Sequence, residues 1–145
     1  MEQVHASCID LKGAGVLIRG PSGSGKSDLA LRLIDAGASL VADDRVDLRR
    51  DGDGLFASAP TEIAGMLEIR GLGIIRLQTA SQQARVEMVV DLMPRESVER
   101  LPEPARCTCL GISLPVLGLA PFEASAPAKV RFALARLAGQ VEAVS

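Results

Sequence analysis

The feature that most constrains this chain is a glycine- and serine-rich loop near its start, made of Gly20, Pro21, Ser22, Gly23, Ser24, Gly25, Lys26 and Ser27. The loop satisfies the pattern G-x-x-x-x-G-K-[ST] of phosphate-binding loops. In such a loop, glycines allow successive backbone N–H groups to point inward at an anion, and the dipole of the following helix adds to the attraction. The lysine contacts the β- and γ-phosphates, and the serine hydroxyl can bind Mg²⁺. We therefore expect residues 20–27 to hold a nucleoside triphosphate together with Mg²⁺.

The segments on either side of the loop predict an α/β unit. Residues 15–19 contain the apolar run Val16, Leu17 and Ile18, two of them β-branched, as in a short buried strand that leads directly into the loop. From residue 27 to residue 36 the apolar side chains recur at helical spacing, and Gly37 stands where a glycine would end the helix. Residues 38–42 then form a second short apolar segment. This order of strand, loop, helix and strand predicts a βαβ-like unit with a tight crossover.

The rest of the chain predicts a mixed sheet. Asp51, Gly52, Asp53 and Gly54 form a hairpin signal between short strands at residues 46–48 and 55–57. Further strands are predicted at residues 4–10, 71–77 and 85–92, a proline-rich loop at 101–106, and a last helix at 126–138 between Ser125 and Gly139. A chain of 145 residues fits one domain. We expect a single α/β domain over residues 1–145, with a phosphate loop and more antiparallel strand than a doubly wound sheet would have.

Composition excludes several classes of function. The net charge of -2 and the absence of Trp and Tyr argue against an electrostatic or stacking grip on nucleic acid. The most apolar segment, residues 112–120, is interrupted by Pro115 and is too short to cross a membrane, and the start lacks a secretory signal. Three cysteines without a CxxC pair favour reduced, partly buried thiols over a zinc site or a disulfide. We therefore expect a cytoplasmic protein. Because aromatic residues are few, we also expect a bound adenine to be held by aliphatic and backbone contacts.

Two adjacent carboxylates follow the second predicted strand. Asp43 and Asp44 come directly after residues 38–42 and should lie at the same edge of the sheet as the phosphate loop. One carboxylate there could bind the metal, and the other could serve as a catalytic base. Adjacent like charges can also raise the pKa of one of the two groups. The alternative is an Asp-Asp turn that faces solvent.

A longer pattern resembles the bacterial HPr kinase/phosphorylase family. The run from Gly20 to Asp44 is similar to that family, and so is a second run, made of Met66, Leu67, Glu68, Ile69, Arg70, Gly71, Leu72, Gly73, Ile74 and Ile75. His5 stands where the family keeps a functional histidine ahead of the loop. The resemblance covers residues 4–92 well and implies the fold of the HPr kinase and phosphoenolpyruvate carboxykinase group.

The resemblance also implies an activity, that of an ATP-dependent protein-serine kinase acting on HPr, a small phosphocarrier of the sugar phosphotransferase system. Lys26 and Ser27 would hold the phosphates and Mg²⁺, and Glu68 would complete the metal site. A bottom-up alternative for Glu68 is a surface carboxylate paired with Arg70.

The remaining catalytic roles follow from the same resemblance. Asp44 would take the proton of the substrate serine, with Asp43 beside it. His5 would lie by the phosphate being transferred, and Arg100 is similar to a family arginine, with Arg95 and Arg106 as rivals nearby.

The chain also departs from the family pattern. It begins too close to the phosphate loop to carry the additional N-terminal domain of typical members, so we expect a form with the catalytic domain alone. Residues 117–125 replace a proline and Gly-Arg-Asn segment that is tied to dephosphorylation, so we expect kinase activity with weak or absent phosphorolysis. Family members form hexamers, which implies a homo-oligomer. Two other functions stay open, a phosphate-loop kinase for a small metabolite and a non-catalytic nucleotide-binding regulator.

Overall fold

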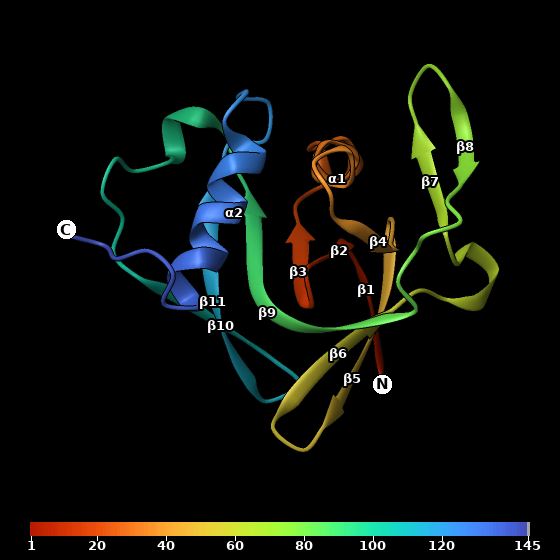
Figure 1. Ribbon diagram of the computed structural model, residues 1–145, viewed down its shortest axis with the longest axis horizontal. Helices are drawn as coiled ribbons and strands as arrows, with labels where there is room; N and C mark the ends of the chain where they lie inside the picture. Colours follow the sequence, from red (N-terminus) through yellow and green to blue (C-terminus); the bar gives the residue numbers. More distant parts are fainter. Residues whose placement is uncertain (145) are drawn as a thin grey trace.

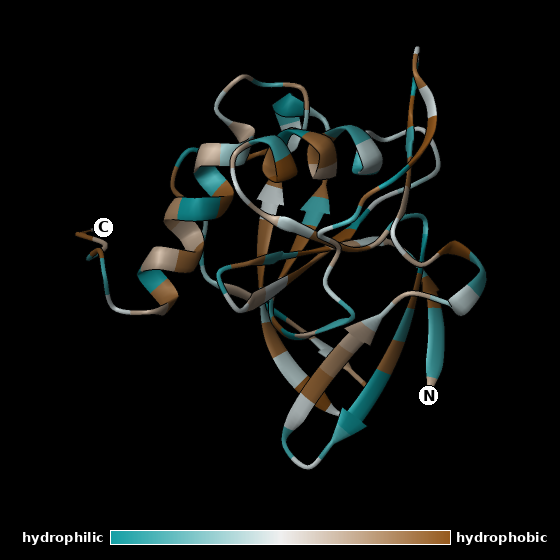
Figure 2. Cartoon of the chain, turned by 45° about the vertical axis from the view of Figure 1, so that its right-hand side comes forward, coloured by the Kyte–Doolittle hydropathy of each residue, from teal (hydrophilic) through white to brown (hydrophobic). Residues whose placement is uncertain are grey.

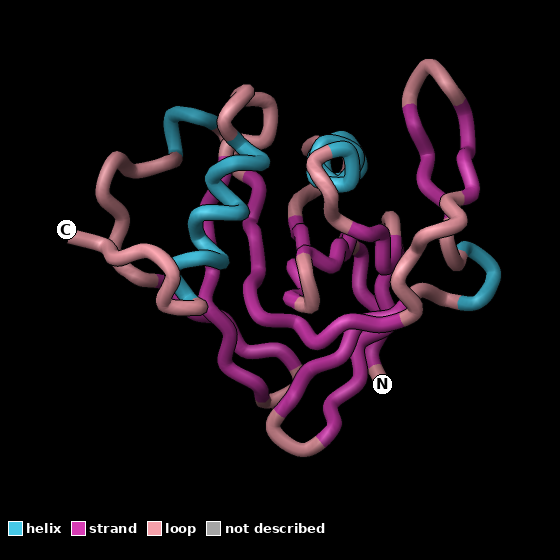
Figure 3. The backbone as a smooth tube through the Cα atoms, viewed as in Figure 1, coloured by secondary structure: helices cyan, strands magenta, loops and turns pink. Residues whose placement is uncertain are grey.

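A strongly curled mixed sheet with two helices on one of its faces organises the chain (Figures 1 and 3). The computed structural model describes residues 1–144. The strands are β1 Glu2–His5, β2 Ser7–Leu11, β3 Ala14–Arg19, β4 Ser39–Ala42, β5 Arg45–Asp51, β6 Gly54–Ser58, β7 Met66–Ile69, β8 Gly73–Arg76, β9 Gln83–Leu92, β10 Ala105–Cys109 and β11 Ile112–Leu119. The helices are α1 Lys26–Asp35 and α2 Ala126–Leu137, with short 3-10 turns η1 at Thr61–Ile63 and η2 at Arg95–Ser97.

The strand order confirms a mixed sheet with many antiparallel pairs. The main path runs β1-β5-β6-β9-β3-β2-β4, and the β10–β11 hairpin joins it through β11 and β9. Only β3 with β9 and β11 with β9 pair in parallel among the described strands. The predicted tight crossover is wrong in one respect, because β2 lies between β3 and β4 and pairs antiparallel with both. The unit from β3 through α1 to β4 is therefore a βαβ unit split by an intervening strand.

Strand β9 is shared by the two halves of the sheet, and a bulge makes this possible. Its first residues pair antiparallel with β6, and the rest pairs in parallel with β3 (Figure 1). The register shifts there, because Gly15 is opposite Val86 but Val16 is opposite Met88. The extra residue exchanges the faces of the strand, so Val86 before the bulge and Val89 after it enter the same core. One strand thus keeps apolar side chains on the inside of both halves.

Two apolar cores result from the curl. The first lies between the sheet and the helices, where Figure 2 shows hydrophobic strands beneath α1 and α2. Its largest buried members are Ile9, Ile18, Leu29, Leu33, Met88 and Leu119. The second lies inside the curl of the sheet, with Leu17, Val46, Leu48, Leu55, Val89 and Leu114 among its members. Together they hold the edge of the sheet from which the loop at residues 20–27 emerges.

Several predicted elements differ from the observed ones. The strand predicted at residues 4–10 is two strands, because the chain turns at Ala6, where β1 leaves to pair with β5 while β2 pairs with β3. The predicted strand at 71–77 is β8, and β7 is its hairpin partner. The hairpin around residues 51–54 and the last helix are confirmed.

The C-terminal hairpin β10–β11 was not predicted. The loop expected at residues 101–106 ends early, since β10 begins at Ala105, and the apolar segment that follows is strand β11. Pro115 lies opposite Arg106 of β10 and comes before Val116, where pairing with β9 begins, so a strand on only one side of β11 meets this residue, which has no N–H to donate. No helix within the described part of the chain is both long and apolar enough to span a bilayer.

The three cysteines are free thiols. Cys8 is fully buried in β2, and that burial, with a smaller effect of the Asp10 charge, raises the pKa of its thiol to about 12. Burial and the neighbouring Cys107 also raise the pKa of the Cys109 thiol. A raised pKa keeps a thiol protonated and weakly nucleophilic at neutral pH.

The close approach of β3 and β9 makes Gly15 sensitive to substitution. A Cβ at Gly15 would lie 2.6 Å from the carbonyl oxygen of Arg85, and a backbone atom cannot rotate away as a flexible side chain can. We expect Gly15→Ala to lower the free energy of unfolding by about 2 kcal/mol, measured by urea titration. Gly118→Ala in β11 is a matched control, because its Cβ would meet only the flexible end of Met93. Equal effects of the two substitutions would contradict this account.

Candidate active site

The loop at residues 20–27 joins the carboxyl end of β3 to the start of α1, as its motif predicts. Gly23 and Gly25 adopt left-handed φ angles of 79° and 103°, which a residue with a side chain rarely adopts. Gly25 precedes the first residue of α1 and accepts a hydrogen bond of 2.9 Å from the N–H of Leu29. The loop therefore presents backbone N–H groups and a helix N-terminus at one place, which favours an anion.

Lys26 places a positive charge at the centre of this loop. The residue is buried, and its Nζ donates hydrogen bonds to the carbonyl oxygens of Gly20, at 2.8 Å, and Pro21, at 3.0 Å. An ammonium group has three donors, so one remains for a further acceptor. The lysine thus ties the loop together and keeps its charge beside the backbone N–H groups.

Asp43 links three separate elements. It is only 6% exposed, and its Oδ1 accepts hydrogen bonds from the hydroxyls of Ser7 in β2, at 2.9 Å, and Ser27 in α1, at 2.7 Å. Its Oδ2 accepts a longer bond of 3.4 Å from the backbone N–H of Glu68 in β7. The alternative of a solvent-facing turn is therefore wrong for Asp43. The carboxylate fixes the hydroxyl of Ser27 at the start of α1.

Asp44 lies in a strained turn, and its side chain is exposed. Its φ is 70°, and the N–H of Arg45 donates to the carbonyl oxygen of Asp43 at 2.8 Å, which together define a γ-turn. The Asp44 side chain is 66% exposed, and its Oδ1 lies 3.6 Å from Nδ1 of His5. Two adjacent carboxylates thus have different environments. One is buried and fully hydrogen-bonded, and the other is free to meet a second molecule.

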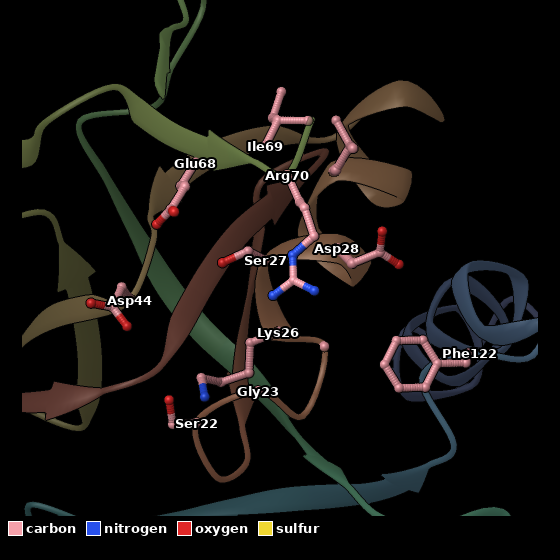
Figure 4. Close-up of a pocket in the computed structure, with 12 residues that line it drawn as sticks. Ser22, Gly23, Lys26, Ser27, Asp28, Asp44, Glu68, Ile69, Arg70 and Phe122 are labelled. Atoms are coloured by element: carbon pink, nitrogen blue, oxygen red, sulfur yellow. The ribbon is translucent and has the colours of Figure 1, made fainter. Parts of the chain in front are cut away.

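A cleft of about 470 Å³ brings most of these groups together (Figure 4). It is lined by Ser22, Gly23, Gly25, Lys26, Ser27, Asp28, Leu31, Asp44, Glu68, Ile69, Arg70 and Phe122. The loop and the first turn of α1 form one side, and the end of β7 forms the other. In Figure 4 the carboxylates of Glu68 and Asp44 lie on one side of Lys26, and the ring of Phe122 lies on the other. The cleft therefore has an acidic end and an aromatic end.

Arg70 and Phe122 line this cleft, although the sequence did not mark either as a site residue. Figure 4 shows the guanidinium of Arg70 pointing into the cleft near Ser27 and Asp28. No ion pair joins it to Glu68 among the described residues, which argues against the alternative of a surface pair. Arg70 could have been found from spacing, because residues two apart in extended chain share a face.

Arg100 is not brought to the cleft. It lies in the exposed segment between η2 and β10, and this segment runs outside α2, on the side away from α1 and β7 (Figure 1). His5 lies at the cleft margin through its contact with Asp44. The structure thus groups His5, Lys26, Ser27, Asp43, Asp44 and Glu68, and leaves Arg100 apart.

The acidic end of the cleft suits a hard cation held jointly with phosphate. Within residues 1–144, no three His, Cys, Asp or Glu side chains cluster as a self-sufficient metal site. Mg²⁺ is usually bound by one or two carboxylates together with water and substrate phosphates, rather than by an all-protein cage. The hydroxyl of Ser27 and the carboxylate of Glu68 both line the cleft and offer oxygen atoms of this kind. The residues present therefore fit Mg²⁺.

Comparison with known proteins assigns this arrangement to a family. Residues 1–120 match the profile of the family described as HPr Serine kinase C-terminal domain. The chain belongs to this family. The match ends just after β11, so the segment with Phe122 and helix α2 lie beyond it.

Individual relatives agree with this assignment. The chain is 44% identical to an HPr kinase/phosphorylase of Geobacillus thermodenitrificans, over 79% of this chain and 40% of the relative. It is 41% identical to an HPr kinase/phosphorylase of Chlorobium chlorochromatii, over 81% of this chain and 39% of the relative. The chain thus spans about 40% of the length of such relatives.

A solved structure also matches the fold. The structure of the Hpr(Ser) kinase/phosphatase from Coxiella burnetii superimposes with a TM-score of 0.84 at 28% sequence identity. The alignment covers 97% of this chain and 100% of that chain. The curled mixed sheet is therefore the architecture of a family member.

The γ-turn at Asp44 generates a prediction about stability. At a φ of 70° alanine is disfavoured relative to glycine, so Asp44→Ala should be less stable than Asp44→Gly by about 1 kcal/mol in urea unfolding. Asp28 in α1 is the matched control, because in a helix the glycine variant should instead be the less stable one. Equal stability of the two Asp44 variants would show that this residue does not hold a positive φ.

Proposed function

We propose that this chain is an ATP- and Mg²⁺-dependent protein kinase domain that phosphorylates a serine of an HPr-like phosphocarrier. The observation that carries the proposal is the cleft in which the loop at residues 20–27, the oxygen atoms of Ser27 and Glu68, and the exposed Asp44 lie together. Membership of the family supports an HPr-like protein as the proposed substrate. The proposal includes one catalytic domain over residues 1–145 and a homo-oligomeric assembly.

The loop would hold the phosphates. Its backbone N–H groups and the N-terminus of α1 would surround the β- and γ-phosphate oxygens, and Lys26 would neutralise charge with its free donor. Ser27 and Glu68 would hold Mg²⁺, which neutralises the charge that develops on the leaving phosphate oxygen. Asp43 would act indirectly. It accepts the hydrogen bond of the Ser27 hydroxyl, so the lone pairs of that oxygen would face the cleft.

Asp44 would be the base in the transfer. The serine hydroxyl oxygen attacks the γ-phosphorus, the bond from that phosphorus to the bridging oxygen of ADP breaks, and the hydroxyl proton passes to the Asp44 carboxylate. Exposure suits this role, since a protein side chain must reach the carboxylate. His5, 3.6 Å away, would hold the carboxylate in place, and Arg100 would contribute only if its segment approaches the cleft.

The direct test is incubation with Mg-ATP and purified HPr, followed by mass mapping of the modified serine. Lys26→Ala should cost about 2–4 kcal/mol of transition-state stabilisation, a rate loss of roughly a hundredfold, because a preorganised positive charge is removed. Asp44→Asn should abolish transfer while leaving ATP binding intact. Arg131→Ala, a charge removed from an exposed position on α2, should leave the rate unchanged.

Three outcomes would contradict the proposal. An unchanged rate in Lys26→Ala would remove the role of the loop. Turnover of a small metabolite without transfer to HPr would favour a metabolite kinase. ATP binding without any transfer would favour a nucleotide-binding regulator.

We further predict weak or absent phosphorolysis. Residues 117–125 stand where the resemblance implies a proline and a Gly-Arg-Asn segment tied to dephosphorylation, and this stretch contains neither arginine nor asparagine. Ser-phosphorylated HPr with excess phosphate should release little pyrophosphate compared with the forward rate. Robust pyrophosphate release would overturn this prediction.

A further inference from the structure

A second cavity adjoins the phosphate loop on its aromatic side. It has a volume of about 610 Å³, in the range of small-molecule sites, and its walls are mostly apolar. Leu92, Met93 and Pro94 at the end of β9 form one wall, and Ala120 and Pro121 after β11 form the other. Pro21 and Ser24 of the phosphate loop also line it. The cavity thus lies at the carboxyl ends of parallel strands, where α/β folds bind ligands.

Phe122 joins this cavity to the first cleft, because it lines both. Its side chain is 72% exposed even though it stands beside the loop. One edge of the ring touches the loop, since a Cβ on Gly25 would lie only 2.9 Å from the ring. The ring therefore lies against the backbone that would hold phosphates, with most of its surface open.

The segment that carries Phe122 is anchored on both sides of the ring. The guanidinium of Arg32 in α1 donates hydrogen bonds to the carbonyl oxygens of Pro121 and Glu123. Arg32 is itself held by Asp28, at 3.0 Å, and the Glu123 carboxylate is paired with Lys129, at 3.4 Å. A backbone held in this way loses little conformational freedom when a ligand packs on the ring that it carries.

The orientation of the cleft determines which part of a bound nucleotide lies near the Phe122 ring. A phosphate to be transferred must lie near Asp44 and Glu68, and Phe122 lies at the opposite end of the loop (Figure 4). A nucleotide bound with its terminal phosphate at the acidic end therefore directs its other end toward the ring. Planar bases stack on aromatic faces, and each such contact contributes measurably to affinity.

We infer that Phe122 and the adjoining apolar cavity form the nucleobase site, in which a heteroaromatic base stacks on one face of the ring with aliphatic side chains around it. This inference rests on the proposed function, since it assigns the base end of the nucleotide whose phosphates the loop would hold. Phe122 lies beyond the residues that match the family profile, whereas Leu92, Met93 and Pro94 of the cavity wall lie within them.

The test separates the base from the phosphates. Calorimetric titration compares Mg-ATP with Mg-tripolyphosphate, which has the phosphates but no base, on the wild type and on Phe122→Leu and Phe122→Ala. We expect ATP to bind the wild type more tightly than tripolyphosphate. Both variants should weaken ATP binding about tenfold and leave tripolyphosphate binding unchanged. Phe122→Trp should restore ATP affinity, because it restores an aromatic face.

Phe132→Ala is the matched control, since Phe132 is also exposed but lies on α2 and lines neither cavity. Equal wild-type affinity for the two ligands would overturn the inference while leaving the proposed function intact. Equal losses of both ligands in the Phe122 variants would also overturn it, because the ring would then act through the loop. If neither ligand binds the wild type, the proposed function fails as well.

Discussion

The buried carboxylate of Asp43 is the interaction on which the site depends. It accepts hydrogen bonds from Ser7 and Ser27 and from the backbone of Glu68, which belong to three elements distant in sequence. A carboxylate that is 6% exposed requires such partners, because an unpaired buried charge is strongly destabilising. The need to satisfy this charge therefore aligns the start of α1 with the strand that carries Glu68. It also leaves the next residue, Asp44, to turn outward.

The sheet supplies the frame for this alignment through strand β9. The bulge between Val86 and Met88 changes which side chains of β9 face each core. As a result, β9 contributes apolar side chains both to the core inside the curl and to the core beneath the helices. Its carboxyl end, at Leu92, then emerges beside the phosphate loop and lines the aromatic-side cavity. Strand β9 thus links the curled half of the sheet to the edge where ligands would bind.

Features formed by residues adjacent in the sequence could be predicted, whereas most contacts between distant residues could not. The loop at residues 20–27 is contiguous, so its pattern predicted the strand before it and the helix after it, and the structure confirms both. Ser7 carried no signal, since its role exists only because β2 inserts between β3 and β4. Because Pro115 interrupts the apolar segment at residues 112–120, strand β11 was not predicted, and neither was the position of Phe122 after it. The grouping of His5, Asp44 and Glu68 was expected from a resemblance, because no spacing rule joins residues so far apart.

The two ends of the cleft differ in how they are built. At the acidic end, Asp43, Asp44 and Glu68 lie within the residues that match the family, and their positions follow from the sheet and from one buried charge. At the aromatic end, Phe122 is positioned by hydrogen bonds from Arg32 to neighbouring carbonyl groups, which constrain the backbone but not the identity of the side chain. Substitution at residue 122 is therefore compatible with the fold, whereas substitution at Asp43 would leave hydroxyl and amide donors without their acceptor. The position of the acidic groups is thus tied to the packing of the fold, whereas the side chain at residue 122 is mostly exposed.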